Sequence, residues 1–218
     1  MTVTIELLPE RQEGQVAQAL EWINSGLIIA APLENGYVYL ADAFTHDAVR
    51  AMHVLRGDDL GIAAQVLISN IAVLNGIARE VSPQARTLMN NFWPGMLSFI
   101  LRPHRGLSWD LGDGKRLDQI CVRAPDAEFV LALLQKSGPL AVVSVADAGH
   151  APVLDATLIV GDTPILAGIF DGGELQSSIG STIVSDTETP PTLVRNGSVS
   201  LEALREHIPD MEYESSGN

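Results

Sequence analysis

Apolar positions recur with helical spacing in some segments of the chain and run without interruption in others. Within residues 12–25 they return every three or four positions, which predicts an amphipathic helix with Gly26 at its end. Residues 27–31 form a short apolar run that ends at Pro32, as is typical of a buried strand. Residues 37–40 are predicted to form the neighbouring strand.

The same criteria predict further elements along the chain. Helices are predicted at residues 46–55, 72–79, 83–91, 127–136 and 201–208. Strands are predicted at residues 63–68, 97–101, 119–123, 140–144, 158–160, 181–184 and 192–194. Ser82 and Ser200 stand at N-cap positions, and Pro83 at a first helical position. Because some strands follow one another too closely for a crossover helix, the expected class is α/β, in strict terms α+β, with a twisted mixed sheet.

The length of 218 residues is that of one compact domain. We expect residues 12–208 to form it, residues 1–11 to be an N-terminal extension, and residues 209–218 to be an acidic, disordered tail.

The formal net charge of −14 argues against broad binding to nucleic acid, which requires clustered Lys and Arg. Cys121 is the one cysteine, so no disulfide forms within the chain. The first ten residues lack a basic stretch and do not resemble a secretory signal. No apolar run approaches the ~18–20 residues that span a bilayer. A cytoplasmic protein without membrane contact is expected.

Several polar residues follow predicted strands, where α/β sheets place their ligands. Ser144 ends one apolar run, and Arg123 and Arg195 end two others. Arginine at such a position suits carboxylate or phosphate. Ser181-Thr182 follows a glycine-containing loop and could hold phosphate oxygens. Taken singly, the serines and the threonine are read more readily as strand or turn residues, and the arginines as solvated surface residues.

Other constellations are missing from the sequence. The five histidines show no metal-ligand spacing, and no phosphate-binding loop, dinucleotide fingerprint or hydrolase elbow occurs. No metal site held by side chains is therefore expected.

Several short motifs occur in a fixed order. They are Pro32 with Tyr37, Asp42-Ala43, Trp93-Pro94-Gly95 through Ser98, Val122-Arg123-Ala124-Pro125, Ser181-Thr182-Ile183-Val184 and Arg195-Asn196-Gly197. In order and spacing they resemble the YrdC/Sua5/YciO family, whose best-known members are L-threonylcarbamoyladenylate synthases. The resemblance covers nearly all of residues 12–208.

The resemblance implies a single YrdC-like domain whose sheet and flanking helices surround a large concave cavity. It also implies a reaction in which L-threonine and bicarbonate form a carbamate that attacks the α-phosphate of ATP. Pyrophosphate leaves, and threonylcarbamoyl-AMP serves to modify adenosine 37 of certain tRNAs. Mg²⁺, a partner transferase and RNA binding by some members are implied as well.

The resemblance also assigns site residues. Catalysis falls to Arg56 and Ser144. Binding of substrate or nucleotide falls to Pro32, Glu34, Asn35, Tyr37, Asp58, Ser98, Arg123, Ser181, Thr182 and Arg195.

This chain departs from the family pattern at working positions. The Lys-x-Arg signature is similar to Arg56-Gly57-Asp58, and the Ser-x-Asn signature to Ser144-Val145-Ala146. The opening Thr-Asp-Thr becomes residues 33–35, which begin with Leu33. A charge pair at ~4 Å is worth about 1 kcal/mol in water and about 4 kcal/mol at an effective dielectric of 20. Replacing attraction by repulsion at Asp58 should therefore cost roughly 2–8 kcal/mol, unless Asp58 recruits Mg²⁺.

Three functions remain open from the sequence. The first is a synthase of this type with weakened activity, and the second is a non-catalytic paralogue that keeps a nucleotide- or anion-binding cavity. The third is an RNA-binding module, which the acidic charge disfavours.

Overall fold

The structure is a computed structural model that describes residues 2–159 and 163–213. Its strands are β1 (Val3–Glu6), β2 (Ile28–Leu33), β3 (Gly36–Asp42), β4 (Gln65–Leu67), β5 (Ala78–Arg79), β6 (Leu97–Pro103), β7 (Ile120–Arg123), β8 (Leu140–Ser144), β9 (Leu166–Asp171), β10 (Thr182–Ser185) and β11 (Thr192–Arg195). Its helices are α1 (Gln12–Asn24), α2 (His46–Arg56), α3 (Leu74–Ile77), α4 (Pro83–Phe92), α5 (Glu128–Ser137) and α6 (Leu201–Arg205). Short 3₁₀ turns are η1 (Pro9–Arg11), η2 (Ile71–Val73) and η3 (Ala156–Leu158).

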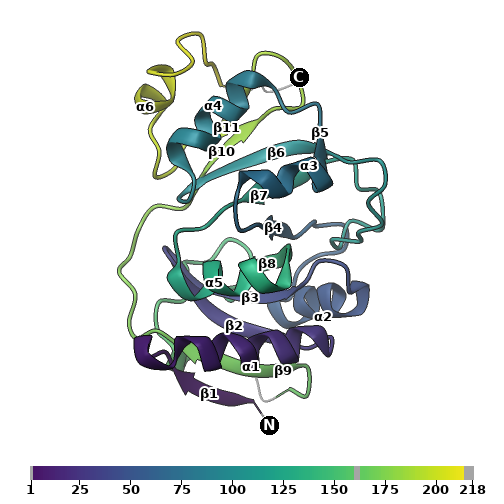
Figure 1. Cartoon of the computed structure of the whole chain (residues 1–218), viewed down its shortest axis with the longest axis vertical. Coiled ribbons are helices and arrows are strands. Elements are labelled where there is room, and N and C mark those ends of the chain that lie inside the picture. The colour runs from purple at the N-terminus through teal and green to yellow at the C-terminus, as the bar shows by residue number, and fades with distance from the viewer. Residues whose placement is uncertain (1, 160–162, 214–218) are drawn as a thin grey trace.

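All strands belong to one eleven-stranded sheet, in the order β1-β9-β2-β3-β8-β4-β7-β6-β10-β11 with β5 beside β6. The pairs β1–β9, β2–β9, β4–β7 and β6–β10 are parallel, and the other pairs are antiparallel. The mixed α/β class expected from the sequence is confirmed. The connection between β9 and β10 runs along one side of the sheet, from near one edge to the other (Figure 1).

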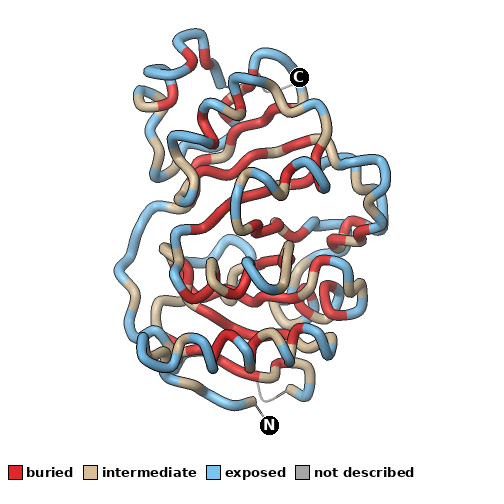
Figure 2. Tube along the Cα trace, in the orientation of Figure 1, coloured by how far each residue is buried: buried red, intermediate tan, exposed pale blue. Residues whose placement is uncertain are grey.

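One face of the sheet is apolar where α1 and α5 cover it. In Figure 1 the two helices lie side by side in front of β2, β3 and β8. They bury Val16, Ile23, Phe129 and Leu133 against strand residues such as Leu40. Figure 2 shows the strands beneath as buried and the outer surfaces of both helices as exposed. This burial fixes the helices on the sheet, because it removes their apolar stripes from water.

The opposite face carries the larger core. Met52 of α2 and Leu88 of α4 pack there against strand residues such as Tyr39 and Phe99. The serine caps predicted from the sequence are confirmed: Ser82 accepts a hydrogen bond from Ala85 N at 3.0 Å, and Ser200 likewise caps α6.

Some predicted elements differ in the structure. The strand predicted at residues 158–160 is wrong, because residues 156–158 form η3, and Val160 lies outside the described residues. The single helix predicted at residues 72–79 is wrong as well, since that segment divides into η2, α3 and β5. Strands β1 and β9 were missed.

The ends of the chain take part in the fold as far as they are described. Residues 3–6, expected to be an extension, form β1 at the edge of the sheet. In the expected tail, Met211 is fully buried and Glu212 O accepts a hydrogen bond from Leu193 N at 2.8 Å. No helix within residues 2–159 and 163–213 is long and apolar enough to cross a membrane.

We predict that Phe170→Ala destabilises the fold by about 3–5 kcal/mol, the usual cost of truncating a buried phenylalanine. The ring of Phe170 is fully buried and lies 4.6 Å from the ring of Phe129 and 5.9 Å from that of Trp22, so it joins β9 to α5 and α1. Urea unfolding measures the change. Leu60→Ala, at a fully exposed side chain, is the control and should stay within about 0.5 kcal/mol of the parent protein. Equal effects of the two substitutions would contradict the packing described here.

Candidate functional site

Beyond the cover of α1 and α5, the same face of the sheet becomes polar. Strand register pairs Val66 with Val122 and Ile100 with Cys121, which puts Gln65 and Cys121 on one face. Ser144 of β8 lies on that face too, because Val142, two residues earlier, pairs with Gln65. We call Gln65, Ser98, Cys121, Arg123, Ser144, Ser181 and Arg195 the polar face.

A chain of hydrogen bonds joins four of these residues. Gln65 Nε2 donates to Ser98 Oγ at 2.8 Å, and Ser98 Oγ donates to Ser181 Oγ at 3.0 Å. Arg195 Nη2 donates to Ser181 Oγ at 3.2 Å and to Ser181 O at 2.7 Å. The buried hydroxyls of Ser98 and Ser181 and the exposed guanidinium of Arg195 therefore lie together, and a guanidinium suits phosphate or carboxylate oxygens.

Close backbone packing holds Ser181 in this position. A Cβ on Gly197 would lie 2.3 Å from Gly180 O and 2.6 Å from Thr182 N, so only glycine fits against this turn. The Thr182 hydroxyl donates to Val199 O at 2.6 Å and accepts from Val199 N at 3.0 Å. Thr182 is fully buried and faces away from the polar face, where it anchors the turn.

Cys121 lies beside this network but is not activated as a nucleophile. Gln65 Nε2 donates to its Sγ at 3.3 Å. Burial raises the pKa of the Cys121 thiol, while the hydrogen bond from Gln65 and the charges of Arg195 and Arg123 oppose that shift. The thiol therefore stays protonated at neutral pH.

Arg123, predicted to bind a ligand, is paired with a carboxylate of the chain itself. Its Nη1 lies 3.1 Å from both Oε1 and Oε2 of Glu34, and the Arg123 side chain is only 3% exposed. Burial lowers the pKa of Arg123 and the Glu34 charge raises it, so the guanidinium remains charged. Asp126 N also donates to Glu34 Oε1 at 2.7 Å, which fixes the carboxylate at the start of α5.

The two residues predicted to be catalytic meet through a backbone turn. Ser144 Oγ accepts a hydrogen bond from Ala146 N at 3.1 Å, and Arg56 Nε donates to Ala146 O at 3.2 Å. The structure thus brings Arg56 and Ser144 to the same turn at the end of β8. Ala146 presents a methyl group there, where the resemblance implied an amide side chain.

Asp58 does not face a ligand as an isolated charge. Its side chain is fully buried, with Oδ2 2.7 Å from His53 Nδ1 and Oδ1 3.2 Å from Arg56 Nη1. His53 Nε2, the other ring nitrogen, lies 2.8 Å from Leu111 O.

This arrangement corrects the repulsion expected from the sequence. That expectation assumed an unpaired carboxylate, whereas the charge of Asp58 is balanced inside the chain by Arg56, and His53 contacts its other oxygen. Nor does Asp58 offer a free site for Mg²⁺. Among the described residues, no group of three or more His, Cys, Asp or Glu side chains could hold a metal ion.

The remaining predicted residues surround the turn between β2 and β3. Pro32 is half-buried in β2, and Glu34 and Asn35 form the turn itself. Tyr37 is fully buried on the face opposite the polar face, where its hydroxyl donates to Gly173 O at 2.8 Å and accepts from Gly172 N at 3.0 Å. Burial is the main reason why the pKa of Tyr37 is raised to about 12.

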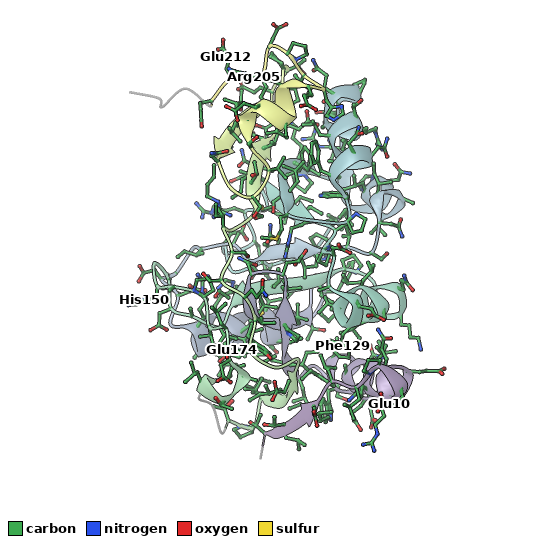
Figure 3. The ribbon with its side chains drawn as sticks, turned by 90° about the vertical axis from the view of Figure 1, so that its left-hand side faces the viewer. Glu10, Phe129, His150, Glu174, Arg205 and Glu212 are labelled. Carbon is green, nitrogen blue, oxygen red and sulfur yellow. The ribbon has the colours of Figure 1, made fainter. Side chains whose placement is uncertain are left out.

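The segment 172–180 passes close to the polar face. A Cβ on Gly180 would lie 3.7 Å from Arg195 Nη2 and 3.9 Å from Asn35 Nδ2, so the segment joins the β2–β3 turn to Arg195. Figure 2 shows it exposed over most of its length. In Figure 3, Glu174 of this segment lies to the left of Phe129 and Glu10.

Four hollows can be described, and none of these four is bordered jointly by Arg56, Ser144, Ser181 and Arg195. One of about 280 Å³ lies between η1, α1 and the start of α5 and reaches Pro32 and Glu34. A larger one of about 660 Å³ lies between α2 and residues 110–116 and includes His53 and Asp58. Strand register and hydrogen bonds, rather than one of these hollows, unite the site residues.

Two site residues were missed by the sequence analysis. Gln65 interrupts an apolar strand, and this polar position inside residues 63–68 was the available signal. His53 lies on the buried side of α2 and is 8% exposed, and its pairing with Asp58 could not be read from a helical pattern.

Comparison with known proteins decides the family. A family model described as telomere recombination, for Sua5, YciO and YrdC proteins, matches residues 21–197. The chain belongs to the Sua5/YciO/YrdC family. It is 32% identical over 210 residues to a Mycobacterium tuberculosis (strain H37Rv) protein named "Putative threonylcarbamoyl-AMP synthase", across 94% of this chain and 95% of that protein.

Solved structures agree with this membership. Pyrococcus abyssi Sua5, in a crystal structure with L-threonine, has a TM-score of 0.86 and 27% identity over 98% of this chain. This chain spans 62% of the length of that protein. Escherichia coli YciO, at 24% identity and a TM-score of 0.77 over 91% of this chain and 96% of that chain, shares the fold.

We predict that Gly197→Ala displaces the Ser181 backbone, because the new methyl group would meet backbone atoms that cannot rotate away. The expected loss of stability is about 1–3 kcal/mol, as for other overpacked sites. Urea unfolding measures it. Gly14→Ala in α1, where a Cβ meets nothing within 4 Å, is the matched control and should be neutral or stabilising by up to about 1 kcal/mol. Equal stability of the two variants would show that the turn tolerates a side chain.

Proposed function

We propose that this protein forms threonylcarbamoyl-AMP from L-threonine, bicarbonate and ATP, more slowly than its relatives do. The observation that carries the proposal is the Ser98–Ser181–Arg195 network on the polar face of a Sua5-like sheet, in which the two serines are buried and Arg195 is exposed. Hydroxyl and guanidinium donors at one place suit the charge that develops on a phosphate during adenylate transfer. The naming of relatives as threonylcarbamoyl-AMP synthases supports the same reaction.

In this reaction the threonine amine and bicarbonate first form a carbamate and release water. A carbamate oxygen then bonds to the α-phosphorus of ATP, and the bond to pyrophosphate breaks. Arg195 and Ser181 would hold phosphate oxygens, while Arg56 and Ser144 would act at the turn that follows β8. The proposal includes a partner transferase, a role in tRNA modification and a cytoplasmic location. The one unpaired cysteine is compatible with a reducing compartment.

Two features of the site support a reduced rate. Arg56 is paired with Asp58, and Ala146 lacks the amide that the family resemblance implies at that position. Removing a hydrogen-bond partner from such a site weakens binding of the transition state. Each such loss lowers the reaction rate by a factor. Mg²⁺ does not fit as an ion held by this chain, because the carboxylate nearest Arg56 is already paired, so no step is assigned to it.

The test incubates the protein with ATP, L-threonine and bicarbonate and detects threonylcarbamoyl-AMP by mass spectrometry. We expect product, formed at least about tenfold more slowly than by P. abyssi Sua5 under the same conditions. Arg195→Gln should lower the rate by a further factor of about ten or more, because it removes a charged donor. Arg105→Gln, at an exposed turn residue, is the matched control and should leave the rate unchanged. Absence of product with an active reference enzyme would refute synthesis, and a rate equal to the reference would refute the reduced rate.

The Asp58–Arg56 pair also favours a second candidate, a non-catalytic protein that binds a nucleotide or another small anion. This candidate predicts that ATP raises the melting temperature without any product. A melting curve with and without ATP, combined with the product assay, separates the two candidates.

A further inference from the structure

We propose that Asp58 is an internal counter-ion that competes with anionic ligands for Arg56 and thereby sets the anion affinity of the polar face. The inference rests on the proposed function in one respect, namely that anions bind beside Arg56. It adds a specificity-determining residue and a cause for the reduced rate proposed above.

The geometry shows that two of the three guanidinium nitrogens of Arg56 already have partners. Nε donates to Ala146 O at 3.2 Å, and Nη1 lies 3.2 Å from Asp58 Oδ1 and donates to Oδ2 at 3.4 Å. The Arg56 side chain is 19% exposed and the Asp58 side chain is fully buried. A phosphate arriving from solvent can therefore reach Arg56, but it meets a guanidinium that already has a carboxylate partner.

Asp58 is itself held in place. His53 Nδ1 lies 2.7 Å from Asp58 Oδ2, and Leu111 O fixes the other ring nitrogen of His53. A Cβ on Gly112 would lie 2.3 Å from His53 Nε2, so the backbone of residues 111–112 closes tightly on the ring. The carboxylate cannot swing away without breaking these contacts, which makes the competition for Arg56 persistent.

The three arginines near the site differ in whether a carboxylate of the chain already pairs with them. Arg123 is paired with Glu34, and Arg56 with Asp58. Arg195 donates only to the carbonyl and hydroxyl of Ser181 among its described hydrogen bonds. The parent protein should therefore meet a phosphate-bearing ligand through Arg195, and removal of the Asp58 charge should free Arg56 as a further cation at the turn beside Ser144.

The test measures binding of inorganic pyrophosphate by titration calorimetry, without threonine or bicarbonate. Asp58→Asn should bind pyrophosphate about ten- to a hundredfold more tightly than the parent protein, because a charge contact is gained at low dielectric. Asp59→Asn makes the same change of charge at the exposed neighbouring residue and should stay within about twofold of the parent. The double variant Arg56→Gln/Asp58→Asn should lose the gain, since the cycle isolates the coupling between the two side chains. Equal affinities of Asp58→Asn and Asp59→Asn, or a gain that survives in the double variant, would overturn the proposal.

A second measurement needs no substitution at Asp58 and keeps the test open if that variant does not fold. In the NMR spectrum of the parent protein, added pyrophosphate should shift the side-chain signal of Arg195 and leave that of Arg56 in place. A shift of the Arg56 signal at the same pyrophosphate concentrations would overturn the proposal. Both arms report on binding alone, so their outcome is independent of whether threonylcarbamoyl-AMP is formed.

Discussion

The alternation of side chains along one continuous sheet is the constraint on which the site depends. Neighbouring residues of a strand point to opposite faces, so a fixed register decides which side chains from distant segments meet. Val66 opposite Val122 and Ile100 opposite Cys121 put Gln65 and Cys121 on one face. The same face is apolar under α1 and α5 and polar where no helix covers it. A shift of one residue in β6 or β7 would turn the polar side chains into the core.

The buried charges near the polar face are paired within the chain. Burying an unpaired arginine or aspartate is costly, and each buried charge near the polar face has an opposite partner supplied by the chain. Glu34 serves Arg123, while Arg56 and His53 serve Asp58. Each pair avoids the cost of an unpaired buried charge, because a carboxylate of the chain itself neutralises the arginine. The same contacts reduce the gain that an anionic ligand can obtain from these arginines.

Local sequence patterns predicted most helices and strands, but they predicted few of the side-chain contacts in the site. Residues 140–144 are a strand with the predicted limits, and Ser82 caps α4 as its position before Pro83 indicated. Strand β9 was missed because Gly168 interrupts its apolar run. That glycine is explained only by the tertiary structure, where a Cβ would lie 2.4 Å from the Trp22 ring. Motif order assigned Ser98, Ser181 and Arg195 to one site, and the structure joins them by hydrogen bonds. The contact of Asp58 with His53 was not predicted, because His53 lies five residues away on a helix whose periodic pattern marks only its apolar face.

The altered positions are linked to one another, which argues for a consistent change of the site rather than for scattered losses. Asp58 binds Arg56, Arg56 binds the carbonyl of Ala146, and Ala146 N binds Ser144. A larger side chain at position 146, which is 8% exposed, would need space beside the turn that Arg56 now closes. Restoring the amide alone should therefore not restore an anion site, because Arg56 would still be held by Asp58. Asp58 and Ala146 are thus linked through Arg56, and removal of the Asp58 carboxylate is the change that first frees the Arg56 guanidinium.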